Sequence, residues 1–199
     1  MISLAIAILL STAAAVAYLN RIPPFRESAK PRIDTGDTCP ALGRSKNLVP
    51  ALRTALPTGQ NYLFVDTPIT GHGDGYSVHC AARIKDVATA LVLWSRAMQP
   101  MDREDWISKQ LNDYTDDNPL KDFKAGVMAT ASITRAAVQV PCHPKGRNTG
   151  MHSNLGVNVF LREAGEASDK DTRQALIDIV RSAAEHAHKD AKCELPSKL

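Results

Sequence analysis

The pattern of apolar and polar residues in the second half of the chain predicts two strands followed by one long helix. Residues 136–142 form a short apolar run that ends in Pro-Cys, and residues 155–161 alternate apolar and polar side chains, as strands do. Ser168 and Asp171 form a capping box, which marks the start of a helix. The apolar stripe of that helix comprises Leu176, Ile179, Val180, Ala183 and Ala187. We expect this stripe to pack on the two strands.

The first half of the chain contains elements of the same two kinds. Tyr76–Ile84 alternates with Cys80 on its apolar face, which predicts a half-buried strand. Residues 88–98 are apolar on both faces, which favours a more central strand. Asp102 and Asp105 form a second capping box, and the helix that follows is expected to run to Asn118-Pro119. Its expected buried stripe comprises Trp106, Ile107, Leu111 and Tyr114.

Three weaker patterns complete the expected fold. Leucines at 48, 52 and 56 recur at helical spacing, Tyr62–Val65 is typical of a strand, and residues 126–133 form an ambiguous, alanine-rich strand. Together these elements predict an α+β fold, with a single mixed or antiparallel sheet and two or three helices packed on it.

The order of the elements repeats along the chain. Val78-His79-Cys80 and Val140-Pro141-Cys142 each lie in a strand that is followed by another strand and then by an acidic-capped helix. This order fits an internal ββα duplication. It also fits a chance echo within an α+β chain, and the sequence leaves both interpretations open.

An apolar N-terminal segment predicts contact with a membrane. Ile2–Leu19 carries no charge and as a helix would span about 27 Å, close to the thickness of a bilayer core. Residues 1–20 are therefore predicted to be a transmembrane anchor or a signal segment, and Ala15-Val16-Ala17 fits a cleavage site. Basic residues follow the segment, namely Arg21, Arg26, Lys30 and Arg32. By the positive-inside rule they favour a cytoplasmic domain, whereas the cysteines described below favour the outside.

The expected organisation is an anchor, a linker and one domain. Residues 21–38 contain three prolines and few apolar side chains, which indicates a flexible linker. Residues 39–199 are expected to form a single extracytoplasmic domain. We predict a single-pass protein of the cell membrane with this domain outside the cytoplasm, and secretion after cleavage is the alternative.

Four widely spaced cysteines indicate disulfides. Cys39, Cys80, Cys142 and Cys193 form no CxxC motif, which disfavours a zinc ribbon or a thioredoxin-type motif. An even number of cysteines behind an apolar N-terminus fits an oxidising compartment, while four separate buried thiols are the alternative. Of three possible connectivities we predict Cys39–Cys80 and Cys142–Cys193, because each ties the flank of a helical segment to a neighbouring strand.

The segment from Cys39 to Cys193 resembles small exported or membrane-anchored actinobacterial proteins of unknown function. The resemblance lies in the Pro-Cys strand, the second strand, the long alanine-rich helix and the terminal cysteine, together with Cys39-Pro-Ala-Leu42 and the strand Tyr76–Cys80. It implies no catalytic residue. Cys39 lies far from the apolar segment, so a lipid-modified cysteine is not supported.

Little in the sequence points to chemistry. The net charge of +3 is spread evenly, which argues against nucleic acid as a partner, and no GxSxG elbow or HExxH motif is present. We predict a non-enzymatic binding or structural domain without a cofactor, attached to the membrane through its N-terminal helix, with its protein or small-molecule partner unknown. The alternative is a metal-dependent or hydrolytic envelope enzyme. Its candidate ligands or catalytic groups are His72, Asp74, His79, His143 and His152.

Overall fold

The computed structural model describes residues 33–34, 36–68, 76–85, 88–111, 118–143 and 153–199. The chain divides into two units, Met1–Lys30 and Pro31–Leu199, and the predicted anchor at 1–20 lies outside the described residues. Among the residues that are described, no helix has the length and apolar character needed to cross a membrane. The folded unit includes part of the expected linker, since Ile33 is fully buried and its carbonyl accepts a hydrogen bond from Arg53.

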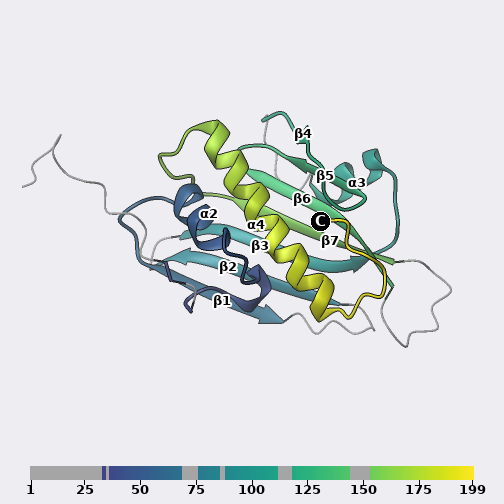
Figure 1. The fold of residues 1–199 in the computed structure, drawn as a ribbon. Helices are drawn as coiled ribbons and strands as arrows, with labels where there is room; N and C mark the ends of the chain where they lie inside the picture. Colours follow the sequence, from purple (N-terminus) through teal and green to yellow (C-terminus); the bar gives the residue numbers. More distant parts are fainter. Residues whose placement is uncertain (1–32, 35, 69–75, 86–87, 112–117, 144–152) are drawn as a thin grey trace, which may run out of the picture. The chain divides into compact units, whose positions relative to one another are not determined.

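One antiparallel sheet of seven strands forms the centre of the folded unit (Figure 1). The strands lie in the order β1-β2-β3-β7-β6-β5-β4, and every neighbouring pair is antiparallel. Their bounds are β1 Tyr62–Pro68, β2 Ser77–Ile84, β3 Ala88–Met98, β4 Lys121–Asp122, β5 Met128–Ala131, β6 Arg135–Cys142 and β7 Ser153–Leu161. A single antiparallel sheet with helices packed on it confirms the predicted α+β fold.

The main core lies between one face of this sheet and the helices η1 (Pro40–Leu42), α2 (Leu48–Ala55) and α4 (Asp169–Asp190). Figure 1 shows α4 crossing the sheet diagonally with α2 beside it. The predicted stripe of α4 is confirmed, because all five of its members are fully buried. The chain also approaches α4 closely at Gly43, where any Cβ would collide with the backbone carbonyl of Ser182.

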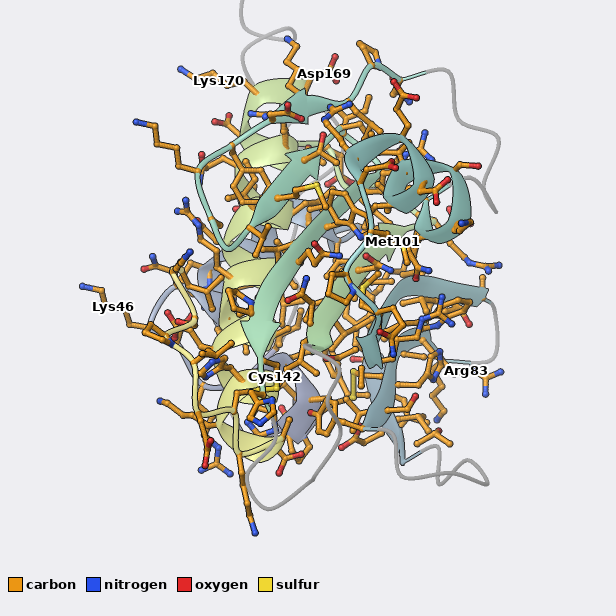
Figure 2. All side chains as sticks on the ribbon, turned by 90° about the vertical axis from the view of Figure 1, so that its right-hand side faces the viewer. Lys46, Arg83, Met101, Cys142, Asp169 and Lys170 are labelled. Carbon is orange, nitrogen blue, oxygen red and sulfur yellow. A yellow bond between two sulfur atoms is a disulfide. The ribbon has the colours of Figure 1, made fainter. Side chains whose placement is uncertain are left out.

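A smaller core lies on the opposite face, beneath α3 (Arg103–Gln110). Figure 2 shows α3 and α4 on opposite sides of the sheet. Trp106 is the main anchor of α3, with 1 % of its surface exposed, and it belongs to the same cluster as Val92, Ala137 and Phe160. We call the two surfaces of the sheet the α4 face and the α3 face.

The N-cap bond of each predicted capping box is present, but α3 is shorter than expected. Asp105 N donates to Asp102, and Asp171 N donates to Ser168. Instead of running to Asn118-Pro119, α3 ends at Gln110. At Leu111 the backbone leaves the helical range, with a φ of −121°, and the Leu111 carbonyl accepts a hydrogen bond from the Arg135 guanidinium. Tyr114 lies outside the described residues.

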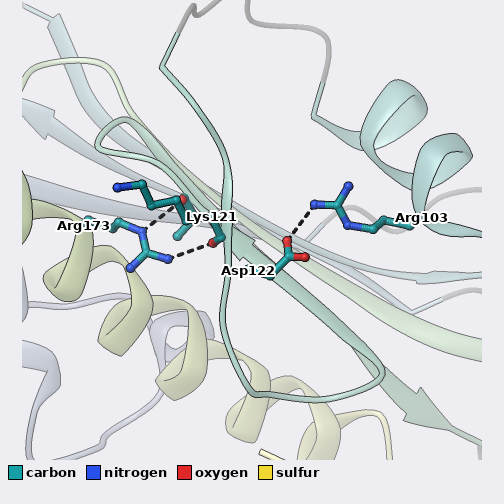
Figure 3. A network of polar contacts seen from close by, with 5 residues as sticks. Arg103, Lys121, Asp122 and Arg173 are labelled. Atoms are coloured by element: carbon teal, nitrogen blue, oxygen red, sulfur yellow. Dashed lines mark hydrogen bonds and ion pairs between the residues drawn. The ribbon is translucent and has the colours of Figure 1, made fainter.

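The β4–β5 edge also differs from the expectation of one strand at 126–133. Gly126 has a φ of 59° and its N–H donates to the Lys198 carbonyl, so it belongs to a turn before β5. The short β4 was not expected because both its residues are polar. Arg173 of α4 holds it in place, donating to the carbonyls of Lys121 and Ala131 over 2.8 and 3.1 Å (Figure 3). On the other side Arg103 of α3 pairs with Asp122 at 2.7 Å.

The strands repeat, but the helices do not. The hairpins β2–β3 and β6–β7 meet through β3 and β7 at the middle of the sheet. Two antiparallel neighbouring strands such as β3 and β7 are related by a two-fold axis perpendicular to the sheet. A rotation about this axis leaves each face of the sheet on its own side. If the whole ββα unit were duplicated, both helices would therefore lie on the same face. Because α3 and α4 lie on opposite faces, the echo does not extend to the helices.

Both predicted disulfides are present. Cys39–Cys80 joins the residue before η1 to β2, and Cys142–Cys193 joins the end of β6 to the segment that follows α4. Two backbone hydrogen bonds accompany the second disulfide, from Cys193 N to His188 O and from Glu194 N to His143 O. The far end of α4 is therefore fastened to the sheet covalently and through the backbone.

Replacing Cys142 and Cys193 together by alanine is expected to lower the free energy of unfolding by about 4 kcal/mol, because the disulfide closes a loop of 51 residues in the unfolded chain. Urea unfolding of the full chain measures this loss. An unchanged unfolding midpoint would contradict the role assigned to this disulfide. Replacing Cys39 and Cys80, which close a loop of 41 residues, is the matched comparison and should cost a similar amount.

Candidate functional site

Two of the five residues predicted for a metal or catalytic site are described, namely His79 and His143. His79 lies in β2, on the α3 face, with its ring centroid 6.2 Å from that of Trp94. Burial lowers the pKa of His79, and the nearby Asp66 charge opposes this effect. His143 follows β6, and its buried Nδ1 has no hydrogen-bond partner. His72, Asp74 and His152 lie outside the described residues.

The strand ends that flank the predicted histidine segments lie at one end of the sheet. Pro68, the last residue of β1, pairs with Val78 near the start of β2. Cys142, the last residue of β6, pairs with Ser153 at the start of β7. The register through β3 connects these two hairpins at the same end. Within the described ranges, however, no three His, Cys, Asp or Glu side chains form a group able to hold a metal ion.

The α3 face brings His79 together with two residues that the sequence did not single out. His79 pairs directly with Trp94 of β3, and Trp94 pairs directly with Asn158 of β7. Residues directly opposite one another in antiparallel strands point to the same face, so the three side chains form a line across three strands. We call them the cross-strand row. Phe160 packs edge-on against Trp94, with ring centroids 6.1 Å apart.

The cross-strand row contains polar atoms with unused hydrogen-bonding capacity. Trp94 Nε1 is a buried donor and Asn158 Oδ1 a buried acceptor, and neither has a hydrogen-bond partner. Only 2 % of the Asn158 surface is exposed, whereas the Trp94 ring is partly exposed. Leaving such a group unpaired costs about 1–3 kcal/mol. A ligand or an ordered water that supplies one acceptor and one donor here would recover that energy.

The surroundings of the row differ on its two sides. Toward α3, the Arg96 guanidinium donates to Gln110 Oε1, and Gln139 Oε1 is another buried acceptor without a partner. Toward β1 the sheet is more open, since Leu63 is 59 % exposed. Figure 2 shows Arg83 of β2 pointing away from the sheet on the same side as α3. The row therefore borders an accessible surface that carries aromatic, amide and guanidinium groups.

A second polar group lies on the α4 face, near the end of α4. Ser95 is fully buried, and neither its hydroxyl nor that of Tyr76 makes a well-formed hydrogen bond. Burial raises the pKa of Tyr76 above its ordinary value, and the negative charges of Asp190 and Asp66 raise it further. Tyr76 is thus a neutral hydroxyl at physiological pH. Sequence reasoning missed this group because its members come from β1, β3, α4 and the residue before β2.

His186 and His188 lie near the C-terminal end of α4. His186 contributes positive charge near Asp66, and His188 Nε2 lies 2.7 Å from the Leu195 carbonyl. Their different neighbours follow from their spacing, because two residues that are two positions apart on a helix point in different directions.

Comparison with known proteins found no family model, no curated protein and no solved structure that matches the chain.

Replacing Asp66 by asparagine is expected to stabilise the protein at neutral pH. Burial raises the pKa of Asp66, the Asp190 charge adds to this rise, and His186 and His79 oppose it. The folded state therefore binds more protons than the unfolded chain just above the ordinary pKa, so stability falls as the pH rises through that window. Because the carboxyl is largely exposed, solvent screening limits the gain on replacement to about 1 kcal/mol or less.

Urea unfolding at pH 7 and near pH 4 measures this effect, with Glu163→Gln as a control at an exposed carboxyl. The Asp66→Asn gain should be present at pH 7 and shrink toward pH 4. A loss of stability at pH 7 would show that the Asp66 charge is favourable in the folded state.

Proposed function

We propose that the protein is a membrane-anchored, extracytoplasmic binding domain without catalytic activity, and that the cross-strand row contacts its ligand. On this proposal it belongs with the small exported actinobacterial proteins that it resembles in its cysteine and strand order. The observation that carries the binding role is the unpartnered donor of Trp94 beside the unpartnered acceptor of Asn158.

Two features support the extracytoplasmic location. Each disulfide has at least one fully buried cysteine: Cys80 has 0 % of its surface exposed, and Cys142 has 1 %. Structural disulfides of this kind form and persist in oxidising compartments. The uncharged segment Ile2–Leu19 has the length of a membrane anchor.

The chemistry of the row favours a neutral, polyhydroxylated ligand such as a saccharide. Hydroxyl groups both donate and accept, so they match an indole N–H next to an amide oxygen. The partly exposed ring of Trp94 offers a flat apolar surface with a negative face, against which the C–H groups of a sugar ring can lie. Ser77 and Arg96 pair directly two residues further along β2 and β3, on the same face as the row, and they add further polar groups.

Co-sedimentation of the full chain with insoluble cell-wall polysaccharide tests this proposal. Trp94→Ala removes the ring and the donor, and it should weaken binding about tenfold or more, equivalent to roughly 1.4 kcal/mol. Trp94→Phe keeps a ring and removes the N–H, so its loss should be smaller. Trp106→Phe is the matched control, because Trp106 lies beneath α3 outside the row.

If Trp94→Ala binds the polysaccharide as tightly as the unmodified chain does, the cross-strand row does not contact the ligand. Absence of binding by the unmodified chain to polysaccharide would reject the saccharide as its ligand.

A metal-dependent enzyme is the second candidate, and the shared sheet end of the strands that flank the histidine segments favours it. Metal analysis of the purified full chain separates the two functions. A binding domain should contain zinc well below one equivalent. One equivalent of zinc that is lost in His79→Ala and His143→Ala would instead support a metal centre.

A further inference from the structure

A cavity of about 740 Å³ lies at the other edge of the sheet, away from the cross-strand row. Its walls come from α3, from the turn between β4 and β5, from α4 and from residues 198–199. We call this cavity the edge pocket. Figure 3 shows the neighbouring part of this edge, where arginines from α3 and α4 approach β4 from opposite sides.

The walls of the edge pocket carry more positive than negative side chains. Arg103, Lys124, Arg181 and Lys198 contribute positive charge, while Asp122 and Glu185 contribute negative charge. Arg103 is already paired with Asp122 at 2.7 Å, so the remaining side chains are three cations and one carboxylate. This excess favours an anionic occupant.

Two buried donors in these walls have no acceptor. Trp106 is 1 % exposed, and its indole N–H is without a hydrogen-bond partner, as is the Nε–H of Arg181. Both groups donate and do not accept. Cationic side chains together with unused donors therefore make the pocket complementary to a group that consists mainly of acceptors.

The arginine is also held in position before any ligand arrives. Arg181 Nη2 donates to the Lys124 carbonyl over 2.7 Å, and its guanidinium lies 5.5 Å from the centroid of the Phe123 ring. A guanidinium fixed in this way loses less freedom on binding an anion than a mobile side chain does.

We propose that the edge pocket binds a phosphate group, with any apolar part of the ligand lying against Phe123 and Met128. A phosphate presents several acceptor oxygens in different directions, which suits a guanidinium, two ammonium groups and an indole N–H arranged around one cavity. The phosphate can belong to inorganic phosphate or to the headgroup of an anionic lipid. This inference is independent of the function assigned to the cross-strand row.

The two tryptophans of the chain allow a direct test. Trp94→Phe leaves Trp106, in the pocket wall, as the only tryptophan. We expect inorganic phosphate, added to this full-length variant in a maltoside detergent at constant ionic strength, to change its fluorescence in a saturable way. Trp106→Phe, which keeps only Trp94, should show no such change. A thermal-shift titration of the unmodified chain replaces this measurement if either variant is poorly folded.

The lysines provide the matched comparison. Lys124→Ala combined with Lys198→Ala should weaken the affinity for phosphate about tenfold or more, since each lysine supplies a charge-assisted contact. Replacing Lys46 and Lys170, which are exposed and do not line the edge pocket, should leave it unchanged. Equal affinities in the two double variants, or no saturable change with any phosphate compound, would overturn the proposal.

A monomeric short-chain phosphatidic acid distinguishes the two sources of phosphate. Tighter binding of this lipid than of inorganic phosphate would assign the pocket to a lipid headgroup with its acyl chain on Phe123. Equal affinities would assign it to free phosphate.

Discussion

The packing of α4 on one face of the sheet is the interaction on which the rest of the structure depends. Its apolar stripe is fully buried against the central strands, and burial of this kind is the main favourable contribution to folding. The Cys142–Cys193 disulfide then fastens the far end of the helix to β6. A second disulfide, Cys39–Cys80, ties η1 to β2. The two disulfides restrict how far η1 and the C-terminal end of α4 can move from the sheet in the unfolded chain, which favours the folded state.

Because the α4 face supplies the main core, the α3 face is free to carry polar groups. One short helix, anchored chiefly by Trp106, covers part of it. The cross-strand row occupies its more open part, and the edge pocket lies at the β4–β5 edge. The cross-strand row thus stands on strands that α4 packs against from the opposite side of the sheet, whereas α4 itself supplies part of the walls of the edge pocket.

The sequence was most informative where a local pattern determines the structure. The strand predicted at Tyr76–Ile84, the N-caps Asp102 and Ser168, and the stripe of α4 follow from patterns of this kind. The structure confirms the two N-caps and the stripe, and it confirms the strand from Ser77 to Ile84. The sequence allowed three cysteine pairings, and the one chosen because it joins helix flanks to strands is the one present.

Features that depend on contacts between distant residues were not predictable. The Leu111 carbonyl at the end of α3 accepts a hydrogen bond from Arg135, and the Lys121 carbonyl in β4 accepts one from Arg173 of α4. No sequence pattern near Arg135 or Arg173 predicts which distant carbonyl group each arginine contacts. Likewise, His79 was identified as a possible site residue, but its neighbours Trp94 and Asn158 follow only from the strand register.

The state of the four cysteines in the native protein tests the central claim most directly. Intact mass of the full chain, alkylated in the cell before lysis and measured with and without prior reduction, counts the free thiols. Peptide mapping without reduction then identifies the pairs. We expect no alkylated cysteine before reduction and four alkylated cysteines after reduction. We also expect peptides that join Cys39 to Cys80 and Cys142 to Cys193. Four free thiols in the native protein would contradict both the covalent fastening of the helices and the proposed extracytoplasmic location.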